Sequence, residues 1–140
     1  MKKIYHCNVC GYIYQDNEPP HECPFCRNRG VFDQIKINKI DFAFLKKAWQ
    51  KQVAWMNSTK YQIEIQLNPD DKVLQGLAET MIKSLQEGKQ AYCPCRILTG
   101  NQLADLKIVC PCYFYMGEVE IWGRCHCSLY VTKKWLDENK

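Results

Sequence analysis

The chain has 140 residues, with 19 Lys and Arg against 15 Asp and Glu, which gives a formal net charge of +4 at pH 7. It holds no stretch near the roughly 18 apolar residues of a membrane span, and Met1 to His6 run into Cys7 without the apolar segment of a signal peptide. The mild charge selects no partner, because nucleic acids, anionic membranes and acidic proteins all attract basic surfaces.

Ten cysteines are the most unusual feature of the composition, and they fall into five tight pairs. The pairs are Cys7/Cys10, Cys23/Cys26, Cys93/Cys95, Cys110/Cys112 and Cys125/Cys127. Cysteines one or two residues apart converge easily on one metal ion or cluster, whereas structural disulfides usually join distant parts of a chain. The spacing therefore predicts metal sites rather than a disulfide-stapled secreted domain, and we expect a cytoplasmic protein, since the cytoplasm keeps thiols reduced.

The first segment, residues 1–37, offers two Cys-x-x-Cys turns, which we call knuckles. Its four candidate metal ligands are Cys7, Cys10, Cys23 and Cys26. Four thiolates suit a tetrahedral iron or zinc ion. Few large apolar residues lie in this segment, so we expect its folding to depend on the metal.

This segment resembles the rubredoxin-like domain of rubrerythrins, in which a Cys-x-x-Cys-Gly-Tyr knuckle meets a Cys-Pro-x-Cys knuckle. It departs from full-length rubredoxins at Arg27, where they carry a glycine. Iron would make the site an electron relay, and zinc would make it a structural clamp. The resemblance favours iron.

Residues 38–59 are predicted to form a connecting helix that begins after Asp41, a candidate N-cap. Its apolar positions recur at three- and four-residue steps, at Phe42, Leu45, Trp49, Val53 and Met56. The alternation of apolar and polar residues from Tyr61 to Leu67 then predicts a short, half-buried strand.

A second helix is expected to begin at Asn68, which offers a capping side chain, with Pro69 at the first helical position. Asp70 and Asp71 would face the positive end of the helix dipole. The apolar face continues until Gly88 ends the helix; it consists of Val73, Leu74, Leu77, Ala78, Met81, Ile82 and Leu85. Farther on, we expect a short apolar run at 103–109 and a loop at 116–117.

The last six cysteines offer two more thiolates than the four that a 4Fe-4S cluster takes. In a Cys-x-Cys motif the two sulfurs cannot be far apart, so a cysteine next to a ligand would lie beside the cluster. A disulfide formed there could be reduced by the cluster. The three motifs are Cys93-Pro94-Cys95, Cys110-Pro111-Cys112 and Cys125-His126-Cys127.

Together with Leu67-Asn68-Pro69-Asp70 and Trp122-Gly123-Arg124, these motifs resemble the catalytic chain of ferredoxin–thioredoxin reductase, over residues 60–140. A rubredoxin-like extension on such a chain resembles the prokaryotic ferredoxin–disulfide reductase branch of the family. The resemblance implies a set of cluster ligands, which are Cys93, Cys110, Cys112 and Cys125. Cys95 would attack the target disulfide, Cys127 would stay against the cluster, and His126 would supply a proton or stabilise a thiolate.

The sequence thus predicts a multidomain protein. A small β/loop rubredoxin-like knuckle domain (1–37) is joined by a connecting helix (38–59) to a mainly α-helical ferredoxin–thioredoxin reductase catalytic domain (60–140). The implied function is a ferredoxin-dependent disulfide (thioredoxin) reductase, with one 4Fe-4S cluster and one mononuclear Fe or Zn. Electrons would come from ferredoxin, directly or through the mononuclear iron, and the substrate would be a thioredoxin-like protein.

No nucleic-acid or membrane partner is expected. Five lysines could dock an acidic ferredoxin, namely Lys46, Lys47 and Lys51 on the first helix, with Lys133 and Lys134 near the end of the chain. A homodimer would bring the two metal centres together if they lie far apart within one chain. The alternative function is a zinc-binding module for nucleic acids or proteins, with the first four cysteines as a zinc ribbon and the last six in further zinc sites. Six ligands, however, do not divide into closed four-coordinate zinc sites.

Overall fold

The computed structural model describes residues 2–58, 64–93, 98–101, 104–105, 107–110 and 115–139. The chain begins with a three-stranded antiparallel sheet of β1 (Lys3–Cys7), β2 (Ile13–Asp16) and β3 (Phe32–Ile35), in the order β2-β1-β3. The sheet places Ile4 and Ile13 in the main apolar core of the molecule. The predicted knuckle segment therefore shares a core with the helices that follow, in addition to any metal it binds.

A short 3-10 helix, η1 (Ile37–Lys39), leads into α1 (Phe42–Ser58). The predicted cap is confirmed, because the Asp41 carboxylate accepts the Phe44 N–H at 2.8 Å. One side of α1 enters the main core with Leu45, Trp49 and Met56. The side towards the knuckle segment carries Phe44, Ala48, Gln52 and Trp55, each of which meets a residue of that segment.

Gly11 determines how the first knuckle lies on α1. It has a φ angle of +82°, and a Cβ atom added there would stand 2.4 Å from the carbonyl oxygen of Ala48. Only glycine combines this backbone conformation with so close an approach. The knuckle therefore rests directly on the helix backbone.

Among the described residues of the predicted strand, 64–67, β4 covers Gln66–Leu67 and pairs antiparallel with β5 (Tyr130–Val131). Tyr61 and Ile63, two of the predicted strand residues, lie outside the described residues. Ile65 is buried, and Asn57 of α1 hydrogen-bonds both its N–H and its carbonyl group. The end of α1 thus holds the backbone at Ile65, next to β4.

The second helix, α2 (Asp71–Gln86), begins two residues later than the sequence predicted. Its N-cap is Asp70, whose carboxylate accepts the Lys72 N–H at 3.0 Å. The prediction of Asn68 as the cap was wrong, because Asn68 binds the chain near the other end of the sequence. It donates its N–H to Leu129 O at 2.9 Å and its amide to Ser128 O at 2.8 Å. The predicted end is confirmed, with Gly88 at a φ angle of +78°.

The predicted loop at Met116-Gly117 was also wrong, since both residues lie within helix α4 (Tyr115–Trp122). Tyr115, Glu118 and Val119 are buried at i, i+3 and i+4, so one face of the helix is anchored. That burial outweighs the cost of about 1 kcal/mol of a glycine inside a helix. The chain ends with α5 (Lys133–Glu138), capped by the Thr132 hydroxyl.

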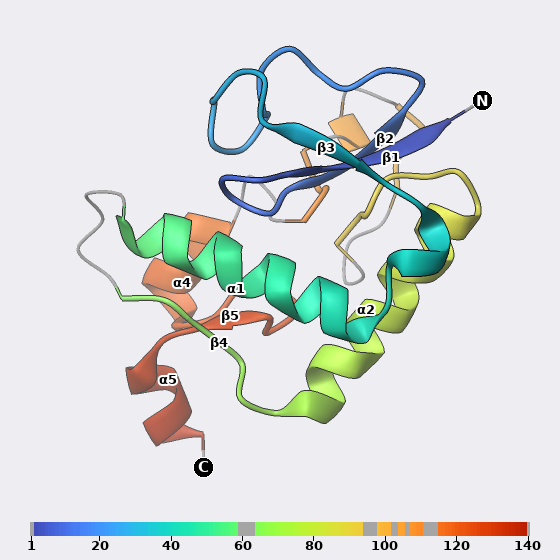
Figure 1. Ribbon diagram of the computed structural model, residues 1–140. Helices are drawn as coiled ribbons and strands as arrows, with labels where there is room; N and C mark the ends of the chain where they lie inside the picture. Colours follow the sequence, from blue (N-terminus) through green and yellow to red (C-terminus); the bar gives the residue numbers. More distant parts are fainter. Residues whose placement is uncertain are drawn as a thin grey trace.

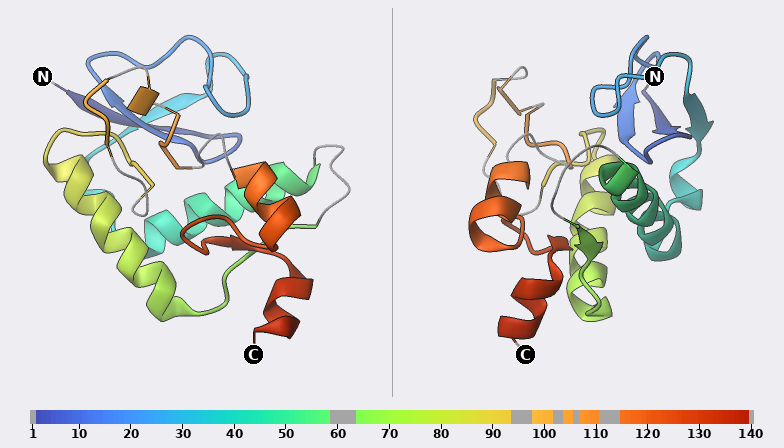
Figure 2. Two further views of the ribbon diagram at one scale, coloured as in Figure 1. Left: turned by 180° about the vertical axis from the view of Figure 1, so that it is seen from behind. Right: turned by 90° about the vertical axis from the view of Figure 1, so that its left-hand side faces the viewer.

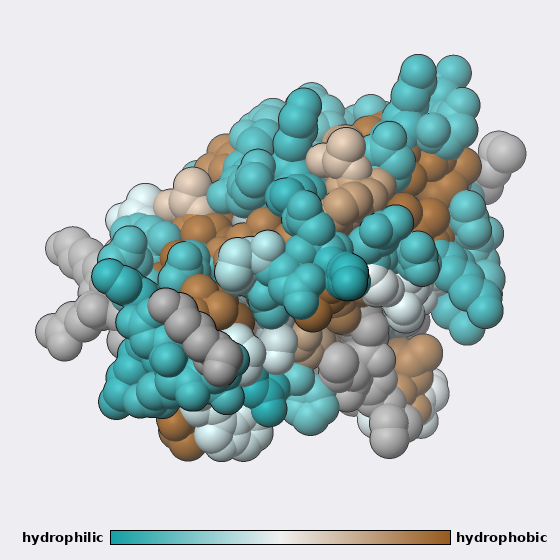
Figure 3. All heavy atoms as spheres, turned by 90° about the horizontal axis from the view of Figure 1, so that it is seen from below, coloured by the Kyte–Doolittle hydropathy of each residue, from teal (hydrophilic) through white to brown (hydrophobic). Residues whose placement is uncertain are grey.

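Helix α1 lies between the three-stranded sheet and the β4–β5 pair, and α2 packs beside it (Figure 1). Figure 2 shows the sheet on one side of the α1–α2 pair and α4 with α5 on the other. The face seen from below is mostly hydrophilic, with its apolar residues in separate patches (Figure 3). In the part of the chain that the structure describes, no helix is long and apolar enough to cross a membrane.

Candidate metal centres and redox site

The four predicted ligands of the knuckle segment lie together and form what we call the four-cysteine site. Their sulfur atoms all lie within 4.8 Å of one another, and all four residues are buried. Cys7 and Cys26 are 3.7 Å apart, and Cys10 and Cys23 are 3.6 Å apart. A tetrahedral ion with metal–sulfur bonds of ~2.3 Å requires sulfur–sulfur edges of about 3.8 Å. The site therefore fits a single tetrahedral metal ion.

Backbone and side-chain groups donate hydrogen bonds to these sulfurs. The N–H groups of Val9 and Cys10 lie 3.4 Å from Cys7 Sγ, and the Asn28 amide lies 3.3 Å from Cys26 Sγ. Arg27, which departs from the rubredoxin pattern, has a φ angle of +66°. It therefore takes the left-handed conformation that a glycine would adopt more easily, so the turn is retained.

Without a cation, the pKa values of Cys7 and Cys10 are shifted in opposite directions. Hydrogen bonds with Cys10 and Cys23 lower the pKa of Cys7, while hydrogen bonds with Cys23 and Cys7 raise the pKa of Cys10. A bound metal ion removes this conflict because its positive charge stabilises every thiolate. The electrostatics of the site thus agree with its geometry.

The second group of cysteines is held by two separate parts of the chain. An isolated antiparallel bridge pairs Tyr92 with Val109, next to Cys93 and Cys110. Cys93 N–H donates to Ile108 O at 2.7 Å, and Cys110 N–H donates to Ala91 O at 3.0 Å. The turn from Cys125 to Tyr130 follows α4, and there Tyr130 N–H points to Cys125 Sγ at 3.3 Å.

These two parts meet around one small cavity, which we call the cysteine cavity. Its lining residues are Cys93, Cys110, Tyr115, Cys125, His126, Cys127 and Tyr130. Cys127 Sγ lies 3.7 Å from Cys93 Sγ and 3.9 Å from Cys125 Sγ. Cys95 and Cys112, the predicted attacking thiol and one predicted ligand, lie outside the described residues.

The donor set of the cysteine cavity fits an iron–sulfur cluster. Burial raises the pKa of the Cys110 thiol well above its ordinary value. Hydrogen bonds with Cys125 and Cys93 raise the pKa of Cys127. Thiols whose pKa is raised in this way, as for Cys110 and Cys127, become thiolates more easily beside the positive charge of metal ions. Cys93, Cys110, Cys125 and Cys127 are the described cysteines of this cavity.

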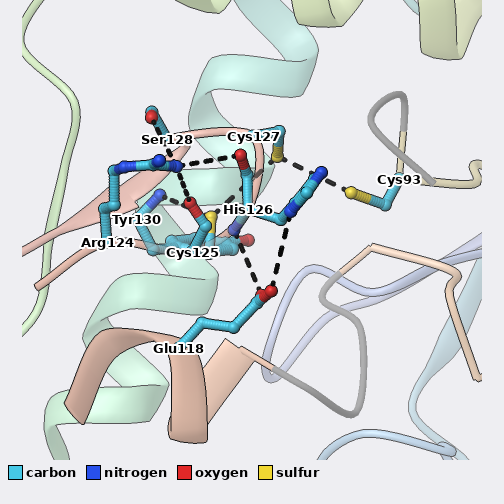
Figure 4. A network of polar contacts seen from close by, with 8 residues as sticks. All are labelled: Cys93, Glu118, Arg124, Cys125, His126, Cys127, Ser128 and Tyr130. Atoms are coloured by element: carbon cyan, nitrogen blue, oxygen red, sulfur yellow. Dashed lines mark hydrogen bonds and ion pairs between the residues drawn. The ribbon is translucent and has the colours of Figure 1, made fainter. Parts of the chain in front are cut away.

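His126 also lines this cavity, and Glu118 of α4 holds its backbone. The Glu118 carboxylate accepts the His126 N–H at 3.1 Å and lies 3.9 Å from the ring atom Nδ1 (Figure 4). The His126 side chain is 44 % exposed, whereas that of Glu118 is 10 % exposed. Arg124 donates to the carbonyl groups of Cys125 and His126, at 3.2 and 3.0 Å. The turn is therefore fixed while the imidazole keeps access to water.

Two comparisons with known families bear on this arrangement. Residues 44–140 match the family model of the ferredoxin thioredoxin reductase catalytic beta chain, which is well over half of the chain. The chain belongs to this family. Residues 5–29 match the rubredoxin-like domain of rubrerythrin. No curated protein matches the chain.

The family membership confirms both resemblances and the predicted fold class, a small β knuckle domain followed by a mainly helical domain. A member of the ferredoxin thioredoxin reductase catalytic chain family is an oxidoreductase that typically binds a 4Fe-4S cluster, and membership implies ferredoxin-dependent reduction of thioredoxin disulfides. The rubredoxin-like site adds a place for one metal ion.

In this reductase chain the four-cysteine site and the cysteine cavity share a wall. Val109 is buried in the same apolar cluster as the four cysteines, and Tyr92 packs against that cluster. Successive residues of an extended strand point to opposite faces. Cys93 and Cys110, the neighbours of Tyr92 and Val109, therefore point away from the four-cysteine site and into the cysteine cavity. Phe25 of the second knuckle also contacts Tyr115, another cavity residue, with ring centroids 5.9 Å apart. The two centres are thus separated by one layer of residues.

Sequence reasoning did not single out Gln52, Glu118 or Tyr130. All three are buried polar residues that touch the site from other elements. Gln52 lies between apolar positions of α1, and Glu118 precedes the last cysteine pair by seven residues. Neither residue belongs to a local sequence motif that would mark it as part of the site. A buried amide or carboxylate can be recognised only when its partner, distant in the sequence, is known.

Proposed function

We propose that this chain is a ferredoxin-dependent disulfide reductase whose substrate is a thioredoxin-like protein. The observation that carries the proposal is the position of Cys127, which lies within 3.9 Å of both Cys93 and Cys125 in one buried cavity. A cysteine so placed is close enough to a cluster held by its neighbours to exchange electrons with it. This closeness is what a disulfide reductase of the family needs.

The roles follow the family motifs. Cluster binding is assigned to Cys93, Cys110, Cys112 and Cys125. Cys95 attacks the target disulfide, and Cys127 stays on the cluster side of the redox pair. When bound, the cluster would supply electrons one at a time to a reaction that consumes two electrons and two protons for each disulfide.

His126 delivers a proton to the departing thiolate. Its backbone is held by the buried Glu118 carboxylate, so the ring stays at the edge of the cavity. Its exposed side allows it to take a new proton from water after each transfer. Arg124 adds rigidity to the same turn through its two carbonyl contacts.

We further propose that electrons enter through the four-cysteine site, with iron as its metal. The shared wall of Tyr92 and Val109 supports this route, because one layer of residues separates the two centres within a single chain. A homodimer is then not required to bring them together. The corresponding division of the chain is 1–37 for the relay, 38–59 for the connecting helix and 60–140 for the reductase.

The direction of electron flow is favourable. Plant-type ferredoxins lie near about −400 mV and thioredoxin near about −270 mV. Two electrons falling through roughly 130 mV release on the order of 6 kcal/mol. Reduction of a thioredoxin-like disulfide by ferredoxin is therefore downhill.

Lys47 and Lys51 are our candidates for docking an acidic ferredoxin. Both are exposed, and the charge of Lys51 acts on His6, which precedes the ligand Cys7. Lys46, another of the five lysines proposed from the sequence, instead forms an ion pair with Asp71 at 2.8 Å. Its charge is therefore already compensated within the chain.

The deciding experiment is the content of iron, zinc and acid-labile sulfide in anaerobically purified protein, followed by reduction of a thioredoxin-like disulfide with reduced ferredoxin. We expect about five irons and about four sulfides per chain. About four irons with about one zinc per chain would still support the reductase function, but the four-cysteine site would then hold a structural zinc ion instead of an electron-carrying iron. Zinc without sulfide would instead support the alternative function, a zinc-binding module for nucleic acids or proteins.

A further inference from the structure

Gln52 connects the two metal centres through a single buried side chain. It lies in the middle of α1 and is 2 % exposed. Its Nε2 donates to the carbonyl oxygen of Gly11 at 3.1 Å, and its Oε1 accepts the hydroxyl proton of Tyr130. Gly11 directly follows the ligand Cys10, and the Tyr130 hydroxyl lies 3.9 Å from Cys110 Sγ.

The orientation of the Gln52 amide follows from its first partner. The carbonyl group of Gly11 can only accept a hydrogen bond, so the NH₂ group of Gln52 must face it. The carbonyl oxygen of the amide then faces Tyr130. A tyrosine hydroxyl has one proton, and here it goes to Gln52. Tyr130 therefore presents only lone pairs to the sulfur of Cys110.

This arrangement matters because hydrogen bonds to cluster sulfurs help to set the reduction potential of an iron–sulfur cluster. A donor on a thiolate sulfur stabilises the more negative, reduced state and raises the potential. The hydroxyl of Tyr130 is such a donor within reach of Cys110, but it is engaged elsewhere. A low potential is what the reduction of a disulfide requires.

We propose that Gln52 is a positioning residue that keeps the Tyr130 proton off the Cys110 sulfur and so keeps the cluster potential low. The first knuckle takes part, since the Gly11 carbonyl fixes the orientation of the amide. This inference rests on the proposed function in one respect, the assignment of Cys110 as a cluster ligand.

The test is a spectroscopic redox titration of the cluster in the full chain with both metal centres loaded. Four variants are compared with the natural chain: Gln52→Leu, Tyr130→Phe, the double variant, and Gln50→Leu. The leucine at position 52 approximates the volume of glutamine but binds neither partner. Gln50 is an exposed glutamine of the same helix, so Q50L is the matched control.

In Q52L the freed Tyr130 hydroxyl can turn to Cys110. We expect the midpoint potential to rise by an amount equivalent to about tenfold in the one-electron equilibrium constant, or about 59 mV. Y130F alone should leave the midpoint in place, because the proton it removes is not on the sulfur. The double variant should lose the rise seen in Q52L, and Q50L should match the natural chain.

A Q52L midpoint equal to that of the natural chain would overturn the inference, as would a rise that persists in the double variant. If Q52L does not assemble its cluster, Y130F still tests the inference. A clear fall in the midpoint potential of Y130F would show that the Tyr130 hydroxyl proton lies on the Cys110 sulfur, which would overturn the inference. The absence of acid-labile sulfide from the natural chain would be a different failure, that of the proposed function itself.

Discussion

The sulfur atoms of Cys93 and Cys127 lie 3.7 Å apart, although 34 residues separate them in the sequence. Cys93 is held by the short bridge between Tyr92 and Val109, and Cys127 belongs to the turn that precedes β5. Two independent parts of the fold thus bring a proposed cluster ligand and a proposed redox cysteine into contact. Under the proposed function, this contact would serve electron transfer between a cluster and a disulfide.

This contact leads to a prediction for Cys127→Ser. We expect the variant to keep its cluster, because the proposed ligands are unchanged, but to lose turnover of a thioredoxin-like disulfide, because half of the redox pair is missing. Cluster content is measured from iron and sulfide, and turnover with reduced ferredoxin. Cys125→Ser is the matched comparison and should lose the cluster. A C127S protein without a cluster would show that Cys127 is itself a ligand.

Glycine at position 11 is expected to be essential for the four-cysteine site. In Gly11→Ala, the left-handed φ angle costs about 1–2 kcal/mol, and the clash with the Ala48 carbonyl adds about 1–3 kcal/mol. Gly30→Ala is the matched control, since Gly30 has a φ angle of +65° with nothing within 4 Å of the added atom.

The free energy of unfolding and the metal content of the four-cysteine site are the measurements for this pair. We expect G30A to show only the conformational cost and to keep its metal. Equal destabilisation of the two variants would mean that the first knuckle does not rest on α1 as described.

Glu118 is expected to influence catalysis by holding His126. Glu118→Ala removes the acceptor of the His126 N–H, so the imidazole is held less precisely. We expect the rate of disulfide reduction to fall by roughly 10-fold to 100-fold. Glu118→Gln keeps an acceptor oxygen and should recover much of the rate. The measurement is kcat at a fixed pH, with cluster content checked in each variant.

Glu120→Ala is the control for this prediction, because Glu120 is an exposed residue of the same helix. It should behave like the natural chain. An E118A protein with unchanged kcat would exclude a positioning role for Glu118.

The docking surface for ferredoxin can be tested by charge reversal. In Lys47→Glu with Lys51→Glu, we expect the KM for an acidic ferredoxin to rise several-fold and its salt dependence to weaken, because charges at the rim of an interface mainly affect association. Lys72→Glu is the control, as an exposed lysine of a different helix, α2. Steady-state rates at several salt concentrations measure the effect. Identical KM values for the double variant and the natural chain would place the docking surface elsewhere.

The sequence by itself determined the features that depend on local spacing. The two Cys-x-x-Cys knuckles and the three Cys-x-Cys motifs predicted both metal centres and the family. The apolar period of α1 and the capping carboxylate of Asp41 predicted that helix, because a helix repeats its contacts every three or four residues. Gly88 likewise predicted the end of α2, since its positive φ angle is a local requirement.

Only the tertiary structure decided the contacts between segments. Asn68 binds residues 128 and 129 instead of capping α2, and burial of Tyr115 and Val119 extends a helix through Gly117. The shared wall of Tyr92 and Val109 and the bridge made by Gln52 join parts of the chain that are far apart in the sequence. A buried polar group is stabilised by the partner that it contacts after folding, and no local sequence pattern identifies that partner.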